Sequence, residues 1–388
     1  MTHKNWKKIG DTFASFRGLS IVGIGDLSSG AISAVFWLYM AAIMNANQYG
    51  EISYLLAIAG MSSTLASLGS QNTLVVYTAK NSPIQSTVFL LVIVSGCIAA
   101  VILFFIFGNT AISAYVLTVM ISGLAVSEIL GRKQYEIYAK YLITQKILMF
   151  GLGFSLYYVL GMNGVIIGIG CSFLIYVTRI YNGFKTTKID FSFIKLHRNF
   201  MSNVYVSDIF SALNGSIDRI IIMPILGFVA LGNYQLGIQF LAITYVLPNI
   251  ISKYIVPDDA TGISNTKIKK LSILLSAVFS ILGIVLSPMI IPIVFPKFDD
   301  AVQVIQITSL AVVPHTISAI YSSKLLGTEN TRTLLLSSIV NFVVLLLALL
   351  TIGQTFGING MAFSYVISVI AACLFFYVAT RMRKITLF

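Results

Sequence analysis

The sequence is poor in charged residues and has few long polar stretches. Only 10% of its 388 residues are charged, whereas a soluble domain has about 25%. Hydrophobic residues make up 57% of the chain, and the mean hydropathy is +0.91. A chain with so little charge cannot cover its apolar surface in water. We therefore expect a polytopic protein of the cell membrane, the inner or plasma membrane, and not a soluble domain.

Several catalytic patterns are also missing. There is no G-x-x-x-x-G-K-[ST] loop for ATP and no soluble segment large enough to hold one. The loops lack the carboxylate cluster with which a glycosyltransferase would hold a metal-bound sugar nucleotide. The three cysteines have neither metal-binding nor redox spacing. We expect a protein that is not an enzyme and that carries no cofactor or metal.

Twelve long apolar runs are the main feature of the chain, since a membrane helix needs roughly 20 apolar residues. The predicted fold is an all-α integral membrane protein with twelve transmembrane helices. Their expected spans are 18–44, 52–79, 84–107, 111–131, 143–161, 163–182, 204–226, 228–251, 271–295, 301–326, 333–353 and 357–380. Only two connections, 183–203 and 252–270, are long.

The basic residues predict the orientation of these helices. With both termini placed in the cytoplasm, every Lys and Arg except Arg219 and Lys297 falls in a cytoplasmic segment. Such a bias is the usual signature of cytoplasmic loops, where it matches anionic lipid headgroups. It accounts for the net charge of +12 without a nucleic-acid surface.

The two halves of the chain repeat short motifs in the same order. Gly161–Gly164 reads G-M-N-G and Gly357–Gly360 reads G-I-N-G. Both stand before the last predicted helix of a half. The pattern predicts two six-helix lobes related by a parallel pseudo-two-fold repeat, as in some transporters.

A second repeated feature lies in the first and seventh predicted helices. Asp26 and Asp208 each stand near the start of such a helix, and a tyrosine follows each in what we expect to be a short outer loop, Tyr49 and Tyr234 respectively. The predicted domains are an N-terminal lobe, a cytoplasmic inter-lobe linker and a C-terminal lobe, with the boundaries 1–183, 184–203 and 204–388.

The seventh predicted helix carries charges that an anchor would not need. Asp208, Asp218 and Arg219 lie within 204–226, and each costs about 2.5–3.5 kcal/mol at the centre of a membrane helix. Eleven residues separate Asp208 from Arg219, which places them about 16 Å apart on nearly one face. Asp218 and Arg219 point about 100° apart, so we expect no close ion pair between them. Asn214, followed by a glycine, could loosen the helix between the charges.

Three further residues each have two interpretations. Asp26 either binds H⁺ or Na⁺ inside the membrane or is hydrated near the inner surface. His315, which follows a proline in the tenth predicted helix, is either a proton-binding group or a core histidine. Glu128, four residues before Arg132, is expected to form an ordinary i,i+4 ion pair.

Two runs accompany the twelve-helix pattern and the twin G-x-N-G motifs: Q-Y-G-E-I-S-Y at Gln48–Tyr54 and I-D-R-I-I-I-M-P-I-L-G-F-V-A-L-G-N-Y at Ile217–Tyr234. With these features the chain resembles the Wzx-type polysaccharide flippases of the multidrug/oligosaccharidyl-lipid/polysaccharide (MOP) exporter superfamily. The resemblance implies a hydrated central cavity lined by the first and seventh helices. The residues at matching positions are Asp26, Asp208, Asp218 and Arg219, to which we add Asn214. The chain departs from many members in having one intramembrane cation, and Lys253 is a candidate helper at the inner mouth.

The expected function is to flip an isoprenoid-diphosphate-linked oligosaccharide, such as an O-antigen unit, from the inner to the outer leaflet. H⁺ or Na⁺ would be the coupling ion, at Asp26, Asp208 or His315. Expected partners are this substrate, membrane lipids and other polysaccharide-assembly membrane proteins. The alternative is an H⁺- or Na⁺-coupled multidrug antiporter. The expected cavity holds three acidic residues, Asp26, Asp208 and Asp218, and only one arginine, which suits a cationic drug. A membrane-embedded glycan polymerase or ligase is disfavoured by the short outer loops.

Overall fold

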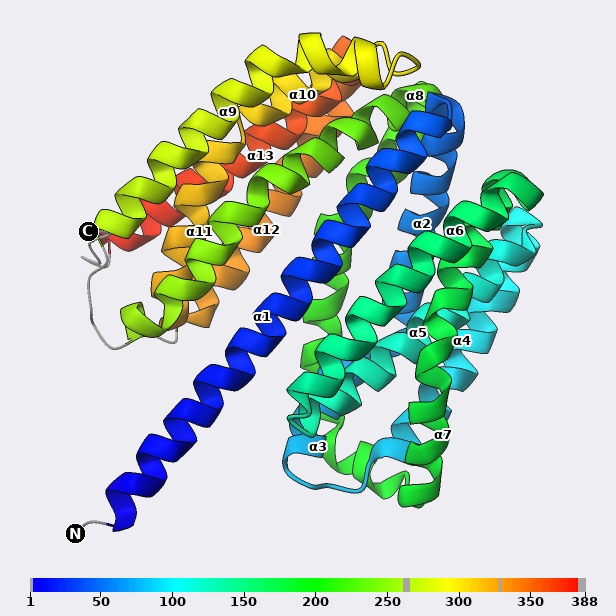
Figure 1. Ribbon diagram of the computed structural model, residues 1–388, viewed down its shortest axis with the longest axis vertical. Coiled ribbons are helices and arrows are strands. Elements are labelled where there is room, and N and C mark those ends of the chain that lie inside the picture. Colours follow the sequence, from blue (N-terminus) through cyan, green and yellow to red (C-terminus); the bar gives the residue numbers. More distant parts are fainter. Residues whose placement is uncertain (1–2, 261–265, 328–329, 383–388) are drawn as a thin grey trace. The chain divides into compact units, whose positions relative to one another are not determined.

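The computed structural model describes residues 3–260, 266–327 and 330–382, which form helices and short connections without any β-strand (Figure 1). The α-helices are α1 (His3–Ile43), α2 (Ala46–Ser67), α3 (Ser70–Ala79), α4 (Gln85–Phe107), α5 (Thr110–Gly131), α6 (Tyr135–Ser172), α7 (Val177–Thr186), α8 (Ser192–Ala260), α9 (Thr266–Val294), α10 (Ala301–Ser309), α11 (Val312–Gly327), α12 (Thr331–Ala348) and α13 (Gln354–Met382). A 3₁₀ turn, η1 (Phe173–Tyr176), precedes α7, and a π turn, η2 (Leu349–Gly353), precedes α13.

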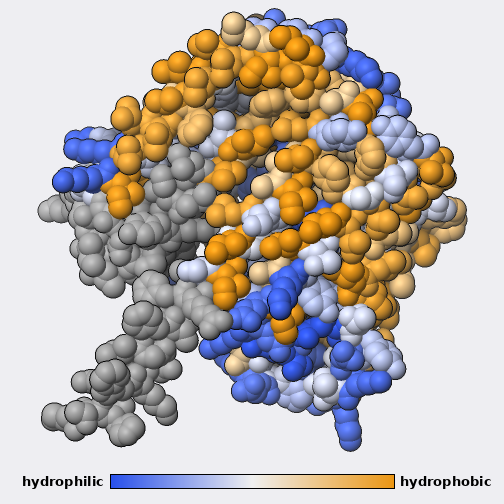
Figure 2. Space-filling model, in the orientation of Figure 1, coloured by the Kyte–Doolittle hydropathy of each residue, from blue (hydrophilic) through white to orange (hydrophobic). Residues whose placement is uncertain are grey.

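The described helices are those of a multi-pass membrane protein. Seven are long and apolar enough to cross a bilayer, or up to nine if each of two bent pairs forms one span. Large apolar side chains point outward along them, including Phe105 on α4 and Ile293 on α9. Figure 2 shows this apolar surface in orange over much of one face. Lipid chains can cover such a surface, whereas a soluble monomer rarely exposes large apolar patches.

Three of the seven candidate spans are 51–53 residues long, and each contains one break at a glycine. The breaks lie at Gly161 in α6, Gly227 in α8 and Gly357 in α13, all with positive φ. L-residues with a side chain are disfavoured there, so glycine allows the chain to leave one helix and begin the next. The breaks fall where the sequence predicts the ends of spans 143–161 and 204–226 and the start of span 357–380.

The twin G-x-N-G motifs have the same local structure. Gly161 has φ 60° and ψ −140°, and Gly357 has φ 60° and ψ −141°. The last glycine of each motif packs against a carbonyl of the preceding helix, where a Cβ atom would collide. The asparagine of each motif pairs with another helix end: Asn109 donates to Asn163 at 2.9 Å, and Asn359 donates to Gln303 at 2.7 Å. This agreement supports the predicted internal repeat.

The chain divides by its contacts into two compact units. Unit 1 contains residues 1–36 and 58–209, and unit 2 contains residues 37–57 and 210–388. The boundaries therefore fall inside α1, α2 and α8, and the sequence-based lobes 1–183 and 204–388 remain a separate prediction. In unit 1, α5 packs against α3, α4 and α6. In unit 2, α13 packs against α10, α11 and α12.

The core of unit 2 is an apolar cluster that surrounds one tyrosine. Its buried members are Ile222, Leu231, Tyr234, Val304, Leu345, Leu349, Met361 and Ala362. They come from both arms of α8 and from α10, α12, η2 and α13. The break at Gly227 is what allows both arms of α8 to reach one core.

The structure corrects four expectations. Spans 52–79 and 301–326 are not single straight helices, because they bend by 51° between α2 and α3 and by 42° between α10 and α11. Most of the linker 184–203 is helical, within α7 and α8. The helix is not loosened at Asn214, since the one non-helical residue in α8 is Gly227. Tyr49 and Tyr234 do not lie in outer loops: both are within helices and fully buried.

Candidate functional site

Asp26 accepts a hydrogen bond from a tyrosine of α6 in unit 1. The Tyr138 hydroxyl donates to Asp26 Oδ1 at 2.7 Å. Gly25 makes this contact possible, because its missing side chain lets α1 approach Ala139 of α6 closely. Ser29 also donates to the backbone carbonyl of Asp26 at 3.0 Å. Asp26 is half-buried.

Asp208 is held by a different helix of the same unit. Asn72 of α3 donates its amide nitrogen to Asp208 Oδ1 at 3.0 Å. Three residues earlier, the Tyr205 hydroxyl donates to the Leu65 carbonyl at 3.0 Å. Gly69, with φ 71°, forms the bend between α2 and α3 and leaves room for the backbone of α8. The first turns of α8 thus rest on this bend and place Asp208 beside Asn72.

Asp218 belongs to unit 2 and is the most buried of the predicted site residues, with 8% of its surface exposed. The Tyr234 hydroxyl donates to Asp218 Oδ2 at 3.1 Å, and the Arg219 backbone N–H donates to Oδ1 at 2.8 Å. Tyr234 reaches Asp218 because Gly227 breaks α8 between them. A buried carboxylate needs such donors to offset its desolvation.

Arg219 bonds mainly to its own helix. Its Nη2 donates to the Gly215 carbonyl and lies 3.5 Å from the Ser216 hydroxyl. Its Nε lies 3.8 Å from Asp218 Oδ1, which is too long for a hydrogen bond but forms a loose ion pair between neighbouring residues that we expected to point apart. Among the described residues, no acidic group on another helix pairs with this guanidinium.

Asn214 connects α8 to α12. Its amide nitrogen donates to the Phe210 carbonyl at 3.0 Å and lies 3.4 Å from the Ser338 carbonyl. Its side-chain oxygen is buried and accepts no hydrogen bond from the described protein groups. A buried acceptor of this kind usually binds water or another ligand. Asn214 therefore offers one available acceptor close to the charged pair of α8.

His315 lies in a second polar group of unit 2 that includes two tyrosines. Its ring stacks on Tyr245 of α8, with centroids 3.8 Å apart and planes 12° apart. The Tyr245 hydroxyl lies 3.4 Å from the hydroxyl of Tyr365, which itself packs on the core containing Tyr234. His315 Nε2 is buried and has no hydrogen-bond partner among the described groups.

Sequence reasoning missed the partners of the predicted residues. Asn72, Tyr138, Tyr245 and Tyr365 were not singled out, and Tyr234 was singled out only as an expected loop residue. Aromatic residues are abundant in membrane helices and mostly belong to interfacial belts. No short-range signal in the sequence pairs Asp26 with a residue 112 positions away. Only the Asp218–Tyr234 pair had a usable signal, the glycine between its two members.

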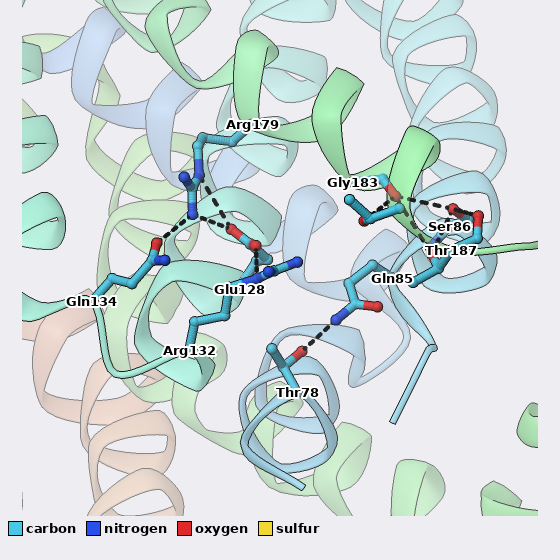
Figure 3. Close-up of polar contacts among 10 residues, drawn as sticks. Thr78, Gln85, Ser86, Glu128, Arg132, Gln134, Arg179, Gly183 and Thr187 are labelled. Carbon is cyan, nitrogen blue, oxygen red and sulfur yellow. Dashed lines mark hydrogen bonds and ion pairs between the residues drawn. The ribbon is translucent and has the colours of Figure 1, made fainter. Parts of the chain in front are cut away.

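Glu128 forms an ion-pair cluster apart from these residues (Figure 3). The expected pair with Arg132 is confirmed, and Arg179 of α7 also binds Glu128 Oε2, at 2.8 Å from Nη2 and 3.2 Å from Nε. Gln134 accepts a further bond from Arg179 at 2.6 Å. With Glu128 only 3% exposed, the cluster fastens α7 to the end of α5.

The described residues contain no group of three or more His, Cys, Asp or Glu side chains that could hold a metal ion. The side chain of Lys253, expected at the inner mouth, lies outside the described ones. Asp26 and Asp208 fall in unit 1, whereas Asn214, Asp218, Arg219 and His315 fall in unit 2. The predicted site residues are thus divided between the two units.

Comparison with known proteins gives a consistent fold. No family model matches the sequence, and no curated protein matches it by sequence. An inward-facing multidrug resistance MATE family transporter of the MOP superfamily has a TM-score of 0.65 at 13% identity, over 93% of this chain and 95% of that one. The lipid II flippase MurJ, in its inward closed conformation, has a TM-score of 0.61 at 16% identity, over 96% and 87%.

A third similar structure is a MOP superfamily transporter from Pyrococcus furiosus. The reversed polarity of that protein's binding pocket suggests a different function for it. Its TM-score is 0.59 at 13% identity, over 95% of this chain and 96% of that one. Almost the whole chain is thus covered by structures of transporters, and the protein has the fold of the MOP superfamily transporters.

Proposed function

We propose that the protein is a flippase, which moves an isoprenoid-diphosphate-linked oligosaccharide from the inner to the outer leaflet of the cell membrane. The substrate would be an O-antigen unit or another surface-polysaccharide unit. The fold supports this proposal, since it is shared with a lipid II flippase and with MATE transporters. The sugar would cross in a hydrated path, because burying bare hydroxyl groups in hydrocarbon costs several kcal/mol each.

Twelve membrane spans with both termini in the cytoplasm are part of the proposal. The nine spans obtained by joining the bent pairs include three of double length. Each of these three contains one positive-φ glycine, so each is long enough for two crossings of a hydrocarbon core about 30 Å thick. Alternating access between the two six-helix lobes, 1–183 and 204–388, would then expose the substrate path to each side in turn.

The observation that carries the proposal is the environment of Arg219. Its guanidinium donates to a backbone carbonyl of its own helix, lies near a hydroxyl of that helix and forms only a loose ion pair, at 3.8 Å, with the Asp218 carboxylate. Neutral acceptors can be exchanged for a stronger one at little cost. Arginine binds phosphate oxygens with two parallel hydrogen bonds, which suits a diphosphate group. Asn214 would contribute to the same site.

Ion coupling is assigned to carboxylates that already have neutral donors. The Tyr138 hydroxyl donates to Asp26 and the Asn72 amide donates to Asp208, and exchange of these hydrogen bonds would let each carboxylate gain or lose a cation. H⁺ or Na⁺ is the proposed ion, and His315 is a third candidate for H⁺. Other polysaccharide-assembly membrane proteins would supply the substrate and receive it.

The test is transport in liposomes that contain a fluorescent lipid-linked oligosaccharide. A sugar-binding protein added outside scores movement between leaflets. We expect protein-dependent movement that is strongly reduced in Arg219→Ala and Asp218→Ala, with both variants inserted at parental levels. Ser216→Ala, which leaves Arg219 and its backbone contact in place, serves as the matched control. Movement at parental rates in both charge variants would remove α8's charges from the mechanism.

An H⁺- or Na⁺-coupled multidrug antiporter is the second candidate. It is favoured by the three carboxylates, Asp26, Asp208 and Asp218, which outnumber the one arginine and would suit a cationic substrate. The similar MATE structures agree with it. Efflux of a cationic dye driven by a pH or Na⁺ gradient, without movement of the lipid-linked oligosaccharide, would select this function over flipping.

A further inference from the structure

The connection between α7 and α8 is attached to unit 1 along one side. The Thr187 hydroxyl accepts from the Ser86 backbone N–H at 2.9 Å, at the start of α4 (Figure 3). The Asp190 backbone N–H donates to the Thr87 hydroxyl at 2.8 Å. In the first turns of α8, His197 Nδ1 lies 2.9 Å from the Tyr77 hydroxyl. These contacts fix which side of the connection faces away from the unit.

This connection and the first turns of α8 expose apolar residues beside basic ones. Ile189, Phe191 and Leu196 expose 50%, 55% and 77% of their surfaces. The exposed basic residues between and beside them are Lys188, Lys195 and Arg198. We call these six residues the linker patch. Ile189 and Phe191 lie between two candidate spans, which end at Thr186 and begin at Ile194, so membrane crossing does not explain their exposure. Leu196 lies in the first turn of the second span.

The charge of the segment is strongly one-sided. Residues 185–200 contain four basic residues and one acidic residue, Asp190. Hydrogen bonds from Ser192, through its side chain and its backbone, hold the pKa of Asp190 below the usual value for an aspartate. Asp190 thus stays ionised at neutral pH and leaves a clear excess of positive charge. Lys185 also lies over the Tyr181 ring, 4.3 Å from its centroid, at the end of α7.

We propose that the linker patch is an interfacial anchor that binds anionic phospholipid headgroups. Phe191 and Leu196 would enter the boundary between headgroups and acyl chains, while the basic residues contact lipid phosphates. Segments that combine exposed apolar and Lys/Arg residues bind the membrane surface in this way, and the binding strengthens with anionic lipid. A soluble anion would not explain the apolar half of the patch. The proposal is independent of the substrate that the protein transports.

The first experiment measures how deeply Leu196 lies in a bilayer. Full-length Leu196→Cys protein, with Cys97, Cys171 and Cys373 replaced by alanine, carries an environment-sensitive fluorophore in nanodiscs. The lipids are phosphatidylcholine alone or a mixture with phosphatidylglycerol, and each contains a lipid with a quencher just below its headgroup. We expect quenching in both, stronger in the anionic mixture.

The second experiment removes positive charge from the linker patch. Lys188→Gln/Lys195→Gln should abolish the difference between the two lipid compositions. Lys133→Gln/Lys140→Gln removes the same charge from exposed positions outside the linker patch and should preserve the difference. Accessibility of the Leu196 label to water-soluble acrylamide, with no quenching by lipid, would overturn the proposal. Equal quenching in both lipids and in both double variants would overturn the headgroup preference. If the Leu196 label is protected from acrylamide in native membranes but not in nanodiscs, a protein partner and not lipid covers the linker patch.

Discussion

The Tyr234 hydroxyl donates to the Asp218 carboxylate at 3.1 Å, across the break that Gly227 makes in α8. Both residues are buried, and they lie in or beside the apolar core of unit 2. This hydrogen bond links the arm of α8 before Gly227, which carries the charged residues, to the arm after it. It also shows why Asp218 can remain at membrane depth, since the tyrosine and a backbone N–H both donate to it.

Removing the Tyr234 hydroxyl should destabilise the protein through Asp218. In Tyr234→Phe, the buried carboxylate loses one of its two donors, at an expected cost of about 1–3 kcal/mol. The measurement is thermal unfolding in detergent, with Tyr158→Phe as an exposed control. In Asp218→Asn, the effect of Tyr234→Phe should become smaller. Strict additivity of the two changes would show that the residues are not coupled.

The glycine breaks at Gly161 and Gly357 should be equally intolerant of alanine. A Cβ atom at either position meets no neighbour within 4 Å, so only the backbone conformation resists the change. We expect about 1–3 kcal/mol of destabilisation in each variant. Gly215→Ala is the matched control, because Gly215 has the same free space but a helical backbone, where alanine is favoured. Equal melting temperatures in all three variants would contradict this account.

Glu128→Gln should loosen the attachment of α7 to α5. The change leaves Arg132 and Arg179 without their shared carboxylate, and hydrogen bonds to charged groups contribute about 1.5–3 kcal/mol each. Faster hydrogen exchange in residues 177–186 would report the loosening. Glu136→Gln, at an exposed position of α6, provides the comparison. Unchanged exchange in α7 would mean that the ion pairs are not what holds it.

If His315 binds the coupling proton, His315→Gln should flatten the pH dependence of transport. The reason is its buried Nε2, which has no partner among the described protein groups and can accept a proton without breaking a bond. His197→Gln is the control, because His197 pairs with Tyr77 in unit 1. A pH profile identical to the parental one would leave His315 as a core residue stacked on Tyr245.

Arg219→Lys should show whether Arg219 acts through its positive charge or through its two parallel hydrogen-bond donors. Lysine keeps the positive charge but cannot offer two parallel donors to a phosphate group. For a diphosphate substrate we therefore expect slower transport than in the parent and faster transport than in Arg219→Ala. The liposome assay measures all three at matched protein levels. Full activity of the lysine variant would mean that Arg219 acts through its charge alone.

The outline of the fold could be predicted from the sequence because hydrophobic length and glycine are local signals. The spans that meet at Gly161 and Gly227 end where the helices break, since a positive φ is a property of single residues. The bends between α2 and α3 and between α10 and α11 were missed because both lie inside continuous apolar runs. At Gly69, the contact that requires the bend comes from Met201 and Tyr205, which are more than 130 residues away.

The candidate site could be predicted only in part, for the same reason. Charged residues at membrane depth are rare enough to be recognised, so Asp26, Asp208, Asp218 and Arg219 were singled out. Their tyrosine and asparagine partners are common residues, and only the packing of the helices selects them. No local signal in the sequence indicates that Asp208 belongs to unit 1 and Asp218 to unit 2, because α8 is continuous at the unit boundary.

The matching backbone angles at Gly161 and Gly357 have a consequence for the history of the chain. Two helical hairpins that turn in the same way, at the same motif, are what the duplication of one ancestral gene segment would leave behind. The turn then predates the divergence of the halves. Substitutions in one copy can thus be compared with the other copy in the same molecule.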